Sequence, residues 1–168
     1  MDELPSKGHR LREFELRPVE GIGVIHLSDY RGRANLVLIV SDQRSETLEL
    51  LSDIAARYSE IKREEAEVLV IVRLSRPQAA EDKNRLNLTC PVLADDDGRV
   101  HRQLGALDSQ GDDFAAVYVT DRFGEVFGAY RTSGGQPLPG IADILNWLEF
   151  INAQCPECEP PEWPIESA

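Results

Sequence analysis

The sequence LVLIV at residues 36–40 decides the fold, together with VLVIV at residues 68–72. Both runs are continuously apolar and rich in β-branched side chains, which is typical of strands buried on both faces of a sheet. Between them, at residues 46–61, apolar side chains recur at steps of three and four and acids come early, so we expect a helix facing the sheet. The order strand, helix, strand predicts a parallel pair with a right-handed crossover, and therefore an α/β fold.

Weaker patterns complete the sheet. The turn DRFG at residues 121–124 separates two apolar segments and predicts an antiparallel hairpin, which makes the sheet mixed. The remaining expected strands lie at about residues 14–16, 24–27, 91–94, 115–120 and 125–130, and the remaining helices at about residues 77–86, 100–104 and 141–151.

The chain is expected to form one domain, at residues 1–153, followed by a tail at residues 154–168. A length of 168 residues suits a single core. Pro156 ends the last helix, and the tail that follows is rich in proline. Trp163 favours a covered position, so we expect the tail to lie across the domain or a partner chain.

The charge excludes two classes of partner. Asp and Glu number 30 against 18 Lys and Arg, and a net charge of −12 repels both nucleic acid and anionic membrane. The sequence has no apolar run long enough for a membrane span, and its first residues lack the apolar centre of a signal peptide. Three cysteines do not make a secreted disulfide framework, so we expect a reducing, cytoplasmic setting.

Four segments, taken in order, resemble the peroxiredoxin and alkyl hydroperoxide reductase (AhpC/TSA, or redoxin) family of the thioredoxin superfamily. They are LSDYRGR at residues 27–33 leading into the strand at 36–40, AEVLVIV at 66–72, PVLAD at 91–95 with Gly98, and VYVTD at 117–121 with Gly124. The resemblance implies a thioredoxin-like fold, a central mixed sheet flanked by helices. It also implies chemistry at the N-terminal end of the helix that follows residues 36–40.

In that family a peroxide-attacking cysteine sits at this helix N-terminus beside a threonine, and an arginine from a later strand supports the thiolate. Residues 42–50 of this chain, DQRSETLEL, contain no cysteine. Matching the family's Cys-Thr-x-Glu-Leu pattern to Thr47 places Glu46 at the cysteine position, and a shift of one residue places Ser45 there. Neither side chain forms a sulfenic acid. The family's proline is missing as well, and its arginine position falls near Ala115.

Ser45, Glu46 and Thr47 therefore mark a degenerate peroxidatic site, for which two interpretations are open. One is a helix cap, in which Ser45 accepts an amide hydrogen bond and Glu46 meets the positive end of the helix dipole. The other is a residual pocket that binds a ligand without converting it.

Cys155 and Cys158 form a C-x-x-C pair in the tail, with a spacing that suits dithiol redox chemistry or half of a tetrahedral metal site. The preceding helix end and nearby glutamates disfavour a thiolate, whereas a divalent cation would be welcome there. A zinc site needs more ligands, from Cys90, His101 or the pair of a second chain. Two thiols without a special role are the third interpretation. Cys90 is expected to be buried and inert, and His9, His26 and His101 to be surface or satisfied histidines.

Two functions follow from these patterns. The first is a redoxin-like thiol-disulfide oxidoreductase of antioxidant type, whose redox chemistry rests on Cys155 and Cys158 and a thiol-redox partner protein, with no cofactor. The alternative is a non-catalytic thioredoxin-fold binding or assembly module, a homodimer formed through the last helix, with Trp147 and Phe150, and the tail. Zinc shared through Cys155 and Cys158 would clamp that dimer. Whether the chain is an enzyme stays open between the two.

Overall fold

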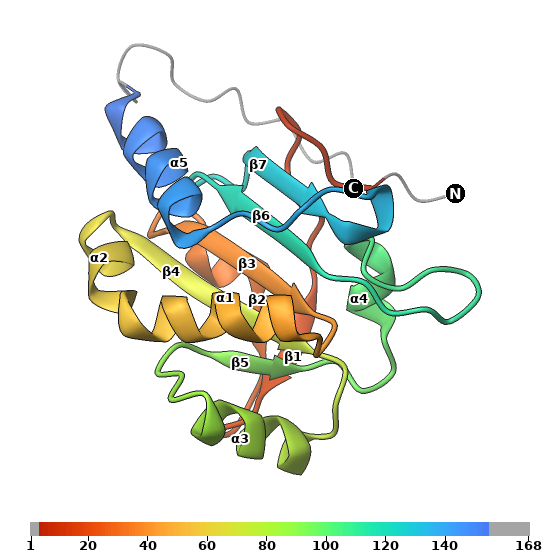
Figure 1. Cartoon of the computed structure of the whole chain (residues 1–168). Helices are drawn as coiled ribbons and strands as arrows, with labels where there is room; N and C mark the ends of the chain where they lie inside the picture. The colour runs from red at the N-terminus through yellow and green to blue at the C-terminus, as the bar shows by residue number, and fades with distance from the viewer. Residues whose placement is uncertain (1–3, 155–168) are drawn as a thin grey trace.

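The two apolar runs form the central strands of the sheet in the computed structural model, which describes residues 4–154 (Figure 1). Strand β3 (Asn35–Ser41) pairs in parallel with β4 (Ala66–Val72), and all seven residues of β3 are buried. The short strand β5 (Val92–Ala94) pairs in parallel with β4, while β6 (Ala116–Thr120) runs antiparallel on the other side of β3. Helices and loops cover both faces of these strands, which explains their unbroken apolar sequence.

Antiparallel strands complete the sheet, whose order is β2-β1-β5-β4-β3-β6-β7. Strand β7 (Val126–Arg131) pairs with β6 through the expected hairpin. Strand β1 (Glu15–Pro18) lies between β5 and the two-residue β2 (Ile25–His26). The segment after β2 turns into a 3₁₀ helix, η1 (Leu27–Tyr30), so β2 is shorter than the sequence predicts. The mixed thioredoxin-like sheet is thereby confirmed.

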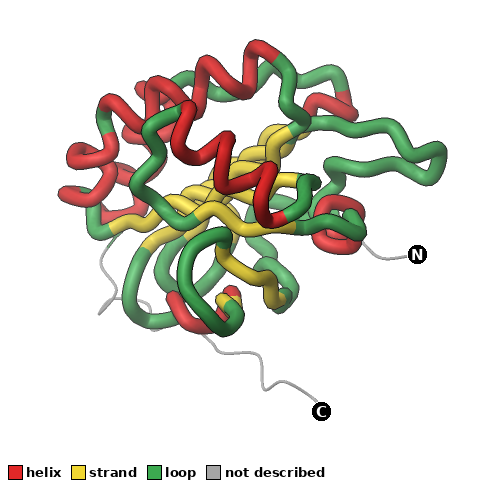
Figure 2. The backbone as a smooth tube through the Cα atoms, turned by 90° about the horizontal axis from the view of Figure 1, so that it is seen from below, coloured by secondary structure: helices red, strands yellow, loops and turns green. Residues whose placement is uncertain are grey.

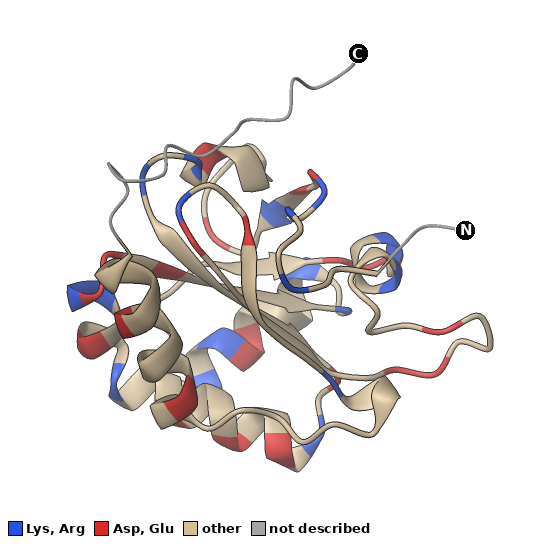
Figure 3. Ribbon diagram, turned by 90° about the horizontal axis from the view of Figure 1, so that it is seen from above, with Lys and Arg blue, Asp and Glu red and all other residues tan. Residues whose placement is uncertain are grey.

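The helices divide unequally between the two faces of the sheet (Figure 2). One face carries α1 (Ser45–Ala56), α2 (Tyr58–Arg63), α3 (Arg76–Arg85) and α5 (Ile141–Ala153). The other is covered by the N-terminal segment, η1 and the short α4 (Arg99–Gln103); the 3₁₀ helix η2 (Thr132–Gly134) follows β7. Each face has its own apolar core. Acidic and basic residues are spread over several helices (Figure 3), but α1 and α5 carry acidic residues and no lysine or arginine.

The single helix expected at residues 46–61 is two helices. Arg57 leaves the helical conformation, with φ −118° and ψ 22°, and its amide donates to the carbonyl oxygens of Asp53 and Ile54 to close the first helix. Ile54 and Ile61 are both fully buried on either side of the break. The apolar spacing therefore continues through the break, which the sequence pattern does not show.

Within the described part of the chain, no helix is long and apolar enough to cross a membrane.

Candidate functional site

The carboxyl ends of the three parallel strands meet at one edge of the sheet, where α1 also begins. The residues that follow β3, β4 and β5 are Asp42, Arg73 and Asp95. Ligand sites of open α/β sheets form at such an edge. This edge is also the position at which the family resemblance implies a reactive group.

Asp42 places its carboxylate at the N-terminus of α1. Its Oδ1 accepts hydrogen bonds from the Arg44 amide, at 3.0 Å, and from the Thr47 hydroxyl, at 2.7 Å. The Asp42 side chain is only 3% exposed and Thr47 is buried, whereas Ser45 and Glu46 are exposed. An anion at a helix N-terminus is stabilised by the free amides and the dipole. In this chain that anion is Asp42.

The expectation that Ser45 caps the helix is wrong. Ser45 is the first helical residue, Arg44 is the N-cap, and no side-chain cap hydrogen bond is made by Arg44. Asp42 takes over part of this role because Gln43, at φ +66°, turns the chain back and brings the Asp42 carboxylate under the first turn. A left-handed conformation in a residue other than glycine is strained, so this loop holds its shape against a local cost.

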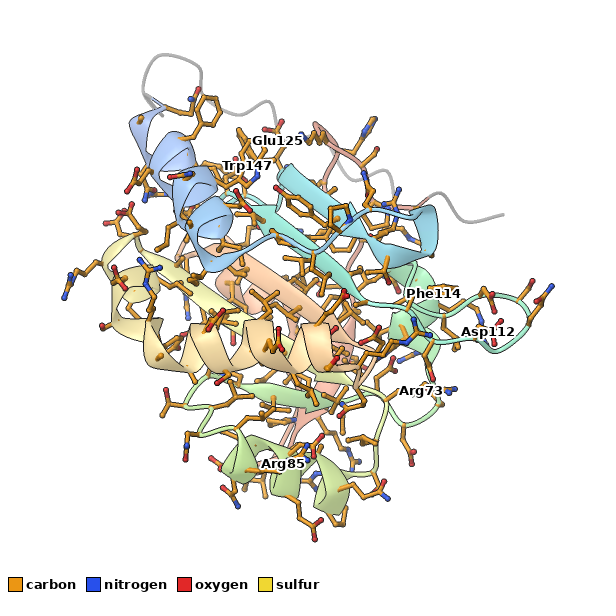
Figure 4. All side chains as sticks on the ribbon, viewed as in Figure 1. Arg73, Arg85, Asp112, Phe114, Glu125 and Trp147 are labelled. Atoms are coloured by element: carbon orange, nitrogen blue, oxygen red, sulfur yellow. The ribbon has the colours of Figure 1, made fainter. Side chains whose placement is uncertain are left out.

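Among the described residues, the two arginines nearest this edge both face carboxylates: Arg44 Nε lies 3.7 Å from Asp42 Oδ2, and Arg73 pairs with Asp113. Arg73 forms a two-point ion pair with Asp113: Nη2 donates to Oδ2 at 2.9 Å, and Nε lies 2.9 Å from Oδ1. Figure 4 shows Arg73 directed towards the base of the protruding loop that carries Asp112 and Phe114. The position near which the family's arginine falls is Ala115, which is fully buried. The next residue, Ala116, begins β6 and pairs with Val40.

A buried pair of side chains, His101 and Asp95, lies directly beneath this edge. His101 and Asp95 are 0% and 1% exposed, and His101 Nδ1 lies 2.8 Å from Asp95 Oδ2. The same carboxylate accepts the His101 amide at 2.7 Å and the Val100 amide at 3.2 Å. On the other side of the ring, Nε2 lies 3.2 Å from the carbonyl oxygen of Ser41, the last residue of β3. The pair thus links α4 to the end of the central strand.

Both neighbours of the His101 ring are hydrogen-bond acceptors: the carboxylate of Asp95 lies at Nδ1 and the carbonyl oxygen of Ser41 at Nε2. Burial raises the pKa of Asp95, but hydrogen bonds from the His101 side chain and amide outweigh this effect, and the pKa lies below its ordinary value of 3.8. Both ring nitrogens of His101 are occupied, which removes it as the ligand kept in reserve for a metal.

The cysteines fall into two groups. Cys90 is 1% exposed, and burial together with the charge of Glu67 raises the pKa of its thiol to about 12, as expected for an inert cysteine. Cys155 and Cys158 lie outside the described residues. Among residues 4–154, no three His, Cys, Asp or Glu side chains are grouped so as to hold a metal ion.

Sequence reasoning missed Asp42, Arg73 and the pair of Asp95 and His101. The signal for the first two was present, because each follows directly on a predicted buried strand. The sequence places Asp95 at the end of the segment at residues 91–95 without giving it a role, and it indicates only that His101 is a surface or satisfied histidine or a further zinc ligand. Asp95 follows β5 and His101 lies in α4, so no single helix or strand repeat relates them, and only the fold brings the two side chains together.

Comparison with known proteins gives the same fold. The AhpC/TSA family model matches residues 7–129, more than two thirds of the chain. The peroxidoxin BcpB of Mycobacterium tuberculosis is 17% identical with a TM-score of 0.75, covering 88% of this chain and 98% of its own. The reduced 2-Cys peroxiredoxin of Plasmodium vivax is 14% identical with a TM-score of 0.75, and the match covers 87% of this chain and 96% of that one. Mycobacterium tuberculosis AhpC is 15% identical with a TM-score of 0.74, and the match covers 93% of this chain and 99% of that one. No curated protein matches. The identities show a shared fold alone, but the family model covers enough of the sequence to establish that this chain belongs to the AhpC/TSA family.

Proposed function

We propose that this chain is a redoxin-like thiol-disulfide oxidoreductase with a degenerate peroxidatic site at Ser45, Glu46 and Thr47, and with its redox chemistry at Cys155 and Cys158. One observation carries the proposal. The carboxylate of Asp42 occupies the anion position at the N-terminus of α1, held by the Thr47 hydroxyl and the Arg44 amide.

The surroundings of α1 support a site that no longer activates a thiol. A thiolate at a helix N-terminus is favoured by nearby positive charge. Here the buried carboxylate of Asp42 occupies that position, and the two arginines at this edge both face carboxylates: Arg44 Nε lies 3.7 Å from Asp42 Oδ2, and Arg73 is paired with Asp113. A thiol placed at residue 45 or 46 would meet a negative neighbour, which raises its pKa.

Elimination among the three cysteines supports the tail. Cys90 is buried with a raised pKa, so thiol chemistry there is disfavoured. In the proposed exchange, one thiolate of the reduced tail pair attacks a disulfide of the partner protein and forms a mixed disulfide. The second tail thiol then displaces the partner's remaining sulfur. The tail pair becomes a disulfide and loses two electrons and two protons, which the partner gains as two thiols. The cytoplasm, where thioredoxin-type partners keep thiols reduced, is the proposed compartment.

Disulfide exchange with a protein substrate tests this function. Insulin reduction is measured with the full chain, supplied with dithiothreitol, and with the Cys155→Ser/Cys158→Ser variant. We expect turnover that the double substitution abolishes and that Cys90→Ser leaves unchanged, because Cys90 is the matched cysteine outside the pair. Equal rates in the chain and the double variant would refute the proposal.

A second candidate function, homodimeric assembly, is favoured by the outer surface of α5. Phe150 is 51% exposed, and its ring packs edge-on against Phe127 and Trp147 at centroid distances of 6.2 and 6.1 Å. Trp147 itself is fixed between α5 and β7, where its Nε1 donates to Tyr130 Oη at 2.8 Å (Figure 4). A rigid aromatic group with one face open is typical of an interface centre. Two C-x-x-C pairs meeting across a two-fold axis would supply four thiolates for zinc.

Light scattering with metal analysis tests the assembly. A zinc-clamped dimer predicts one zinc per two chains, and dissociation on adding a chelator or on the substitution Phe150→Asp. The control Asn146→Asp adds the same charge at another exposed position of α5. A metal-free monomer would contradict this second function.

A further inference from the structure

An open groove of about 660 Å³ lies on the face of the sheet opposite α1 and α5. One wall is the N-terminal segment at residues 12–15, and the other is α4, with Arg99 and Arg102. The ring of Phe14 and the methyl groups of Val100, both buried residues, line its inner part. The groove therefore joins an apolar interior to a rim of arginines.

The acidic side chains of the groove already have partners. Glu13 Oε1 accepts the amides of Phe14 and Ser28 at 3.2 and 3.1 Å, and Glu15 lies 3.5 Å from His26. Arg99 and Arg102, in contrast, form no ion pair with any residue between 4 and 154. Arg33 and Arg63 are exposed and likewise form no ion pair with a described residue, so what distinguishes Arg99 and Arg102 is their place on the wall of a groove with an apolar interior.

We propose that this groove is the docking site of the chain's own acidic tail, residues 155–168. That segment contains four glutamates, Glu157, Glu159, Glu162 and Glu166, and no lysine or arginine. Arg99 and Arg102 offer the forked donors that match carboxylates, and the ring of Trp163 suits the apolar interior. The acidic and aromatic residues of the tail thus match the arginines and the apolar interior of the groove.

The length of the tail permits this docking. Asn152, near the end of α5, bonds to Asn35 at the start of β3, and His101, in α4, contacts Ser41 at the end of β3. These contacts place the end of α5, where the tail begins, and α4, which borders the groove, about 20 Å apart along β3 and about 10 Å apart across the sheet. Fourteen extended residues reach about 46 Å, so the glutamates in the second half of the tail can enter the groove. The docking does not depend on whether Cys155 and Cys158 exchange disulfides.

Paramagnetic broadening in the full chain tests the proposal. A nitroxide is attached at Ser167→Cys in a chain that carries Cys155→Ser and Cys158→Ser; Cys90, buried and weakly acidic, does not react. We expect the amide signals of Val100 and Arg102 to broaden relative to the reduced, diamagnetic label. Raising the salt to about 1 M, where the screening length falls to about 3 Å, should restore them.

Charge reversal provides the matched comparison. Arg99→Glu with Arg102→Glu should abolish the broadening, whereas Arg33→Glu with Arg63→Glu, the same change at two exposed positions outside the groove, should leave it intact. Unbroadened signals at the groove, or broadening that survives Arg99→Glu with Arg102→Glu, would overturn the proposal. So would broadening that appears only when isotope-labelled chains are mixed with nitroxide-labelled ones, because the occupant would then be a second copy.

Discussion

Replacement of Asp95 by asparagine should destabilise this protein far more than the same replacement one residue later. The carboxylate of Asp95 is buried with His101 and accepts three hydrogen bonds, two from amides and one from the ring. Asp96 is exposed and its side chain forms no hydrogen bond or ion pair with any residue between 4 and 154, so Asp96→Asn is a matched control with identical chemistry.

The size of the effect follows from the contacts. Asparagine keeps one acceptor oxygen, which can still receive the bonds now made to Oδ2. Its NH₂ group would then face the Val100 amide, so one hydrogen bond is lost and two donors meet in a closed space. The remaining bonds would lose their charged acceptor, and since a hydrogen bond to a charged group is worth about 1.5–3 kcal/mol, we expect a loss of about 2–3 kcal/mol. Asp96→Asn should change the stability by about 0.5 kcal/mol or less.

Urea denaturation, followed by circular dichroism at neutral pH, measures both variants against the parent chain. A loss for Asp95→Asn no larger than that for Asp96→Asn would refute the assignment of a stabilising buried pair beneath the site.

Acid should remove the difference between the parent and Asp95→Asn. The folded-state pKa of Asp95 lies below its ordinary value of 3.8, so the folded protein binds fewer protons there than the unfolded chain does. The contribution of this carboxylate is therefore fully present above pH 3.8 and is lost as the pH falls through the folded-state pKa. The two urea curves should converge below about pH 3.8. Curves that stay equally far apart in acid would show that the ionised carboxylate is not the source of the difference.

Three further substitutions test the loop at α1 and the packing of α5. Thr47→Val keeps the shape of the side chain but leaves Asp42 without its hydroxyl partner, and should cost about 1–2 kcal/mol in urea denaturation; no loss would mean that the bond is not formed. Gln43→Gly should gain about 1 kcal/mol by relieving the left-handed backbone, and a loss would contradict that strain. Gly128→Ala should cost about 1–3 kcal/mol, because the new Cβ would lie 3.0 Å from Trp147 Nε1; an unchanged midpoint would show that the indole moves freely.

The fold was predictable because its decisive residues are consecutive. The runs at residues 36–40 and 68–72 require burial on both faces, and few arrangements other than central parallel strands provide it. The break at Arg57 was not predictable, because Ile54 and Ile61 keep the helical spacing on both sides of it. The short length of β2 likewise depends on the 3₁₀ turn that starts at Leu27.

The candidate site was predictable in position but not in chemistry. The resemblance located it at the N-terminus of α1, where Ser45 and Asp42 are both plausible capping residues by type. The backbone of Gln43, with its positive φ, decides in favour of Asp42, and no sequence pattern encodes that choice. The pair of Asp95 and His101 depends in the same way on a turn that folds α4 back beneath β3.

The central claim is that the thiol chemistry of this chain takes place at Cys155 and Cys158 in the tail and not at the N-terminus of α1. The most direct measurement is the rate of hydrogen peroxide consumption by the reduced full chain and by Cys155→Ser/Cys158→Ser, with the oxidised residues located by mass spectrometry. We predict slow oxidation that ends in a disulfide between Cys155 and Cys158, with Cys90 unmodified and no consumption by the double variant. Rapid peroxide turnover that persists without Cys155 and Cys158 would contradict the account.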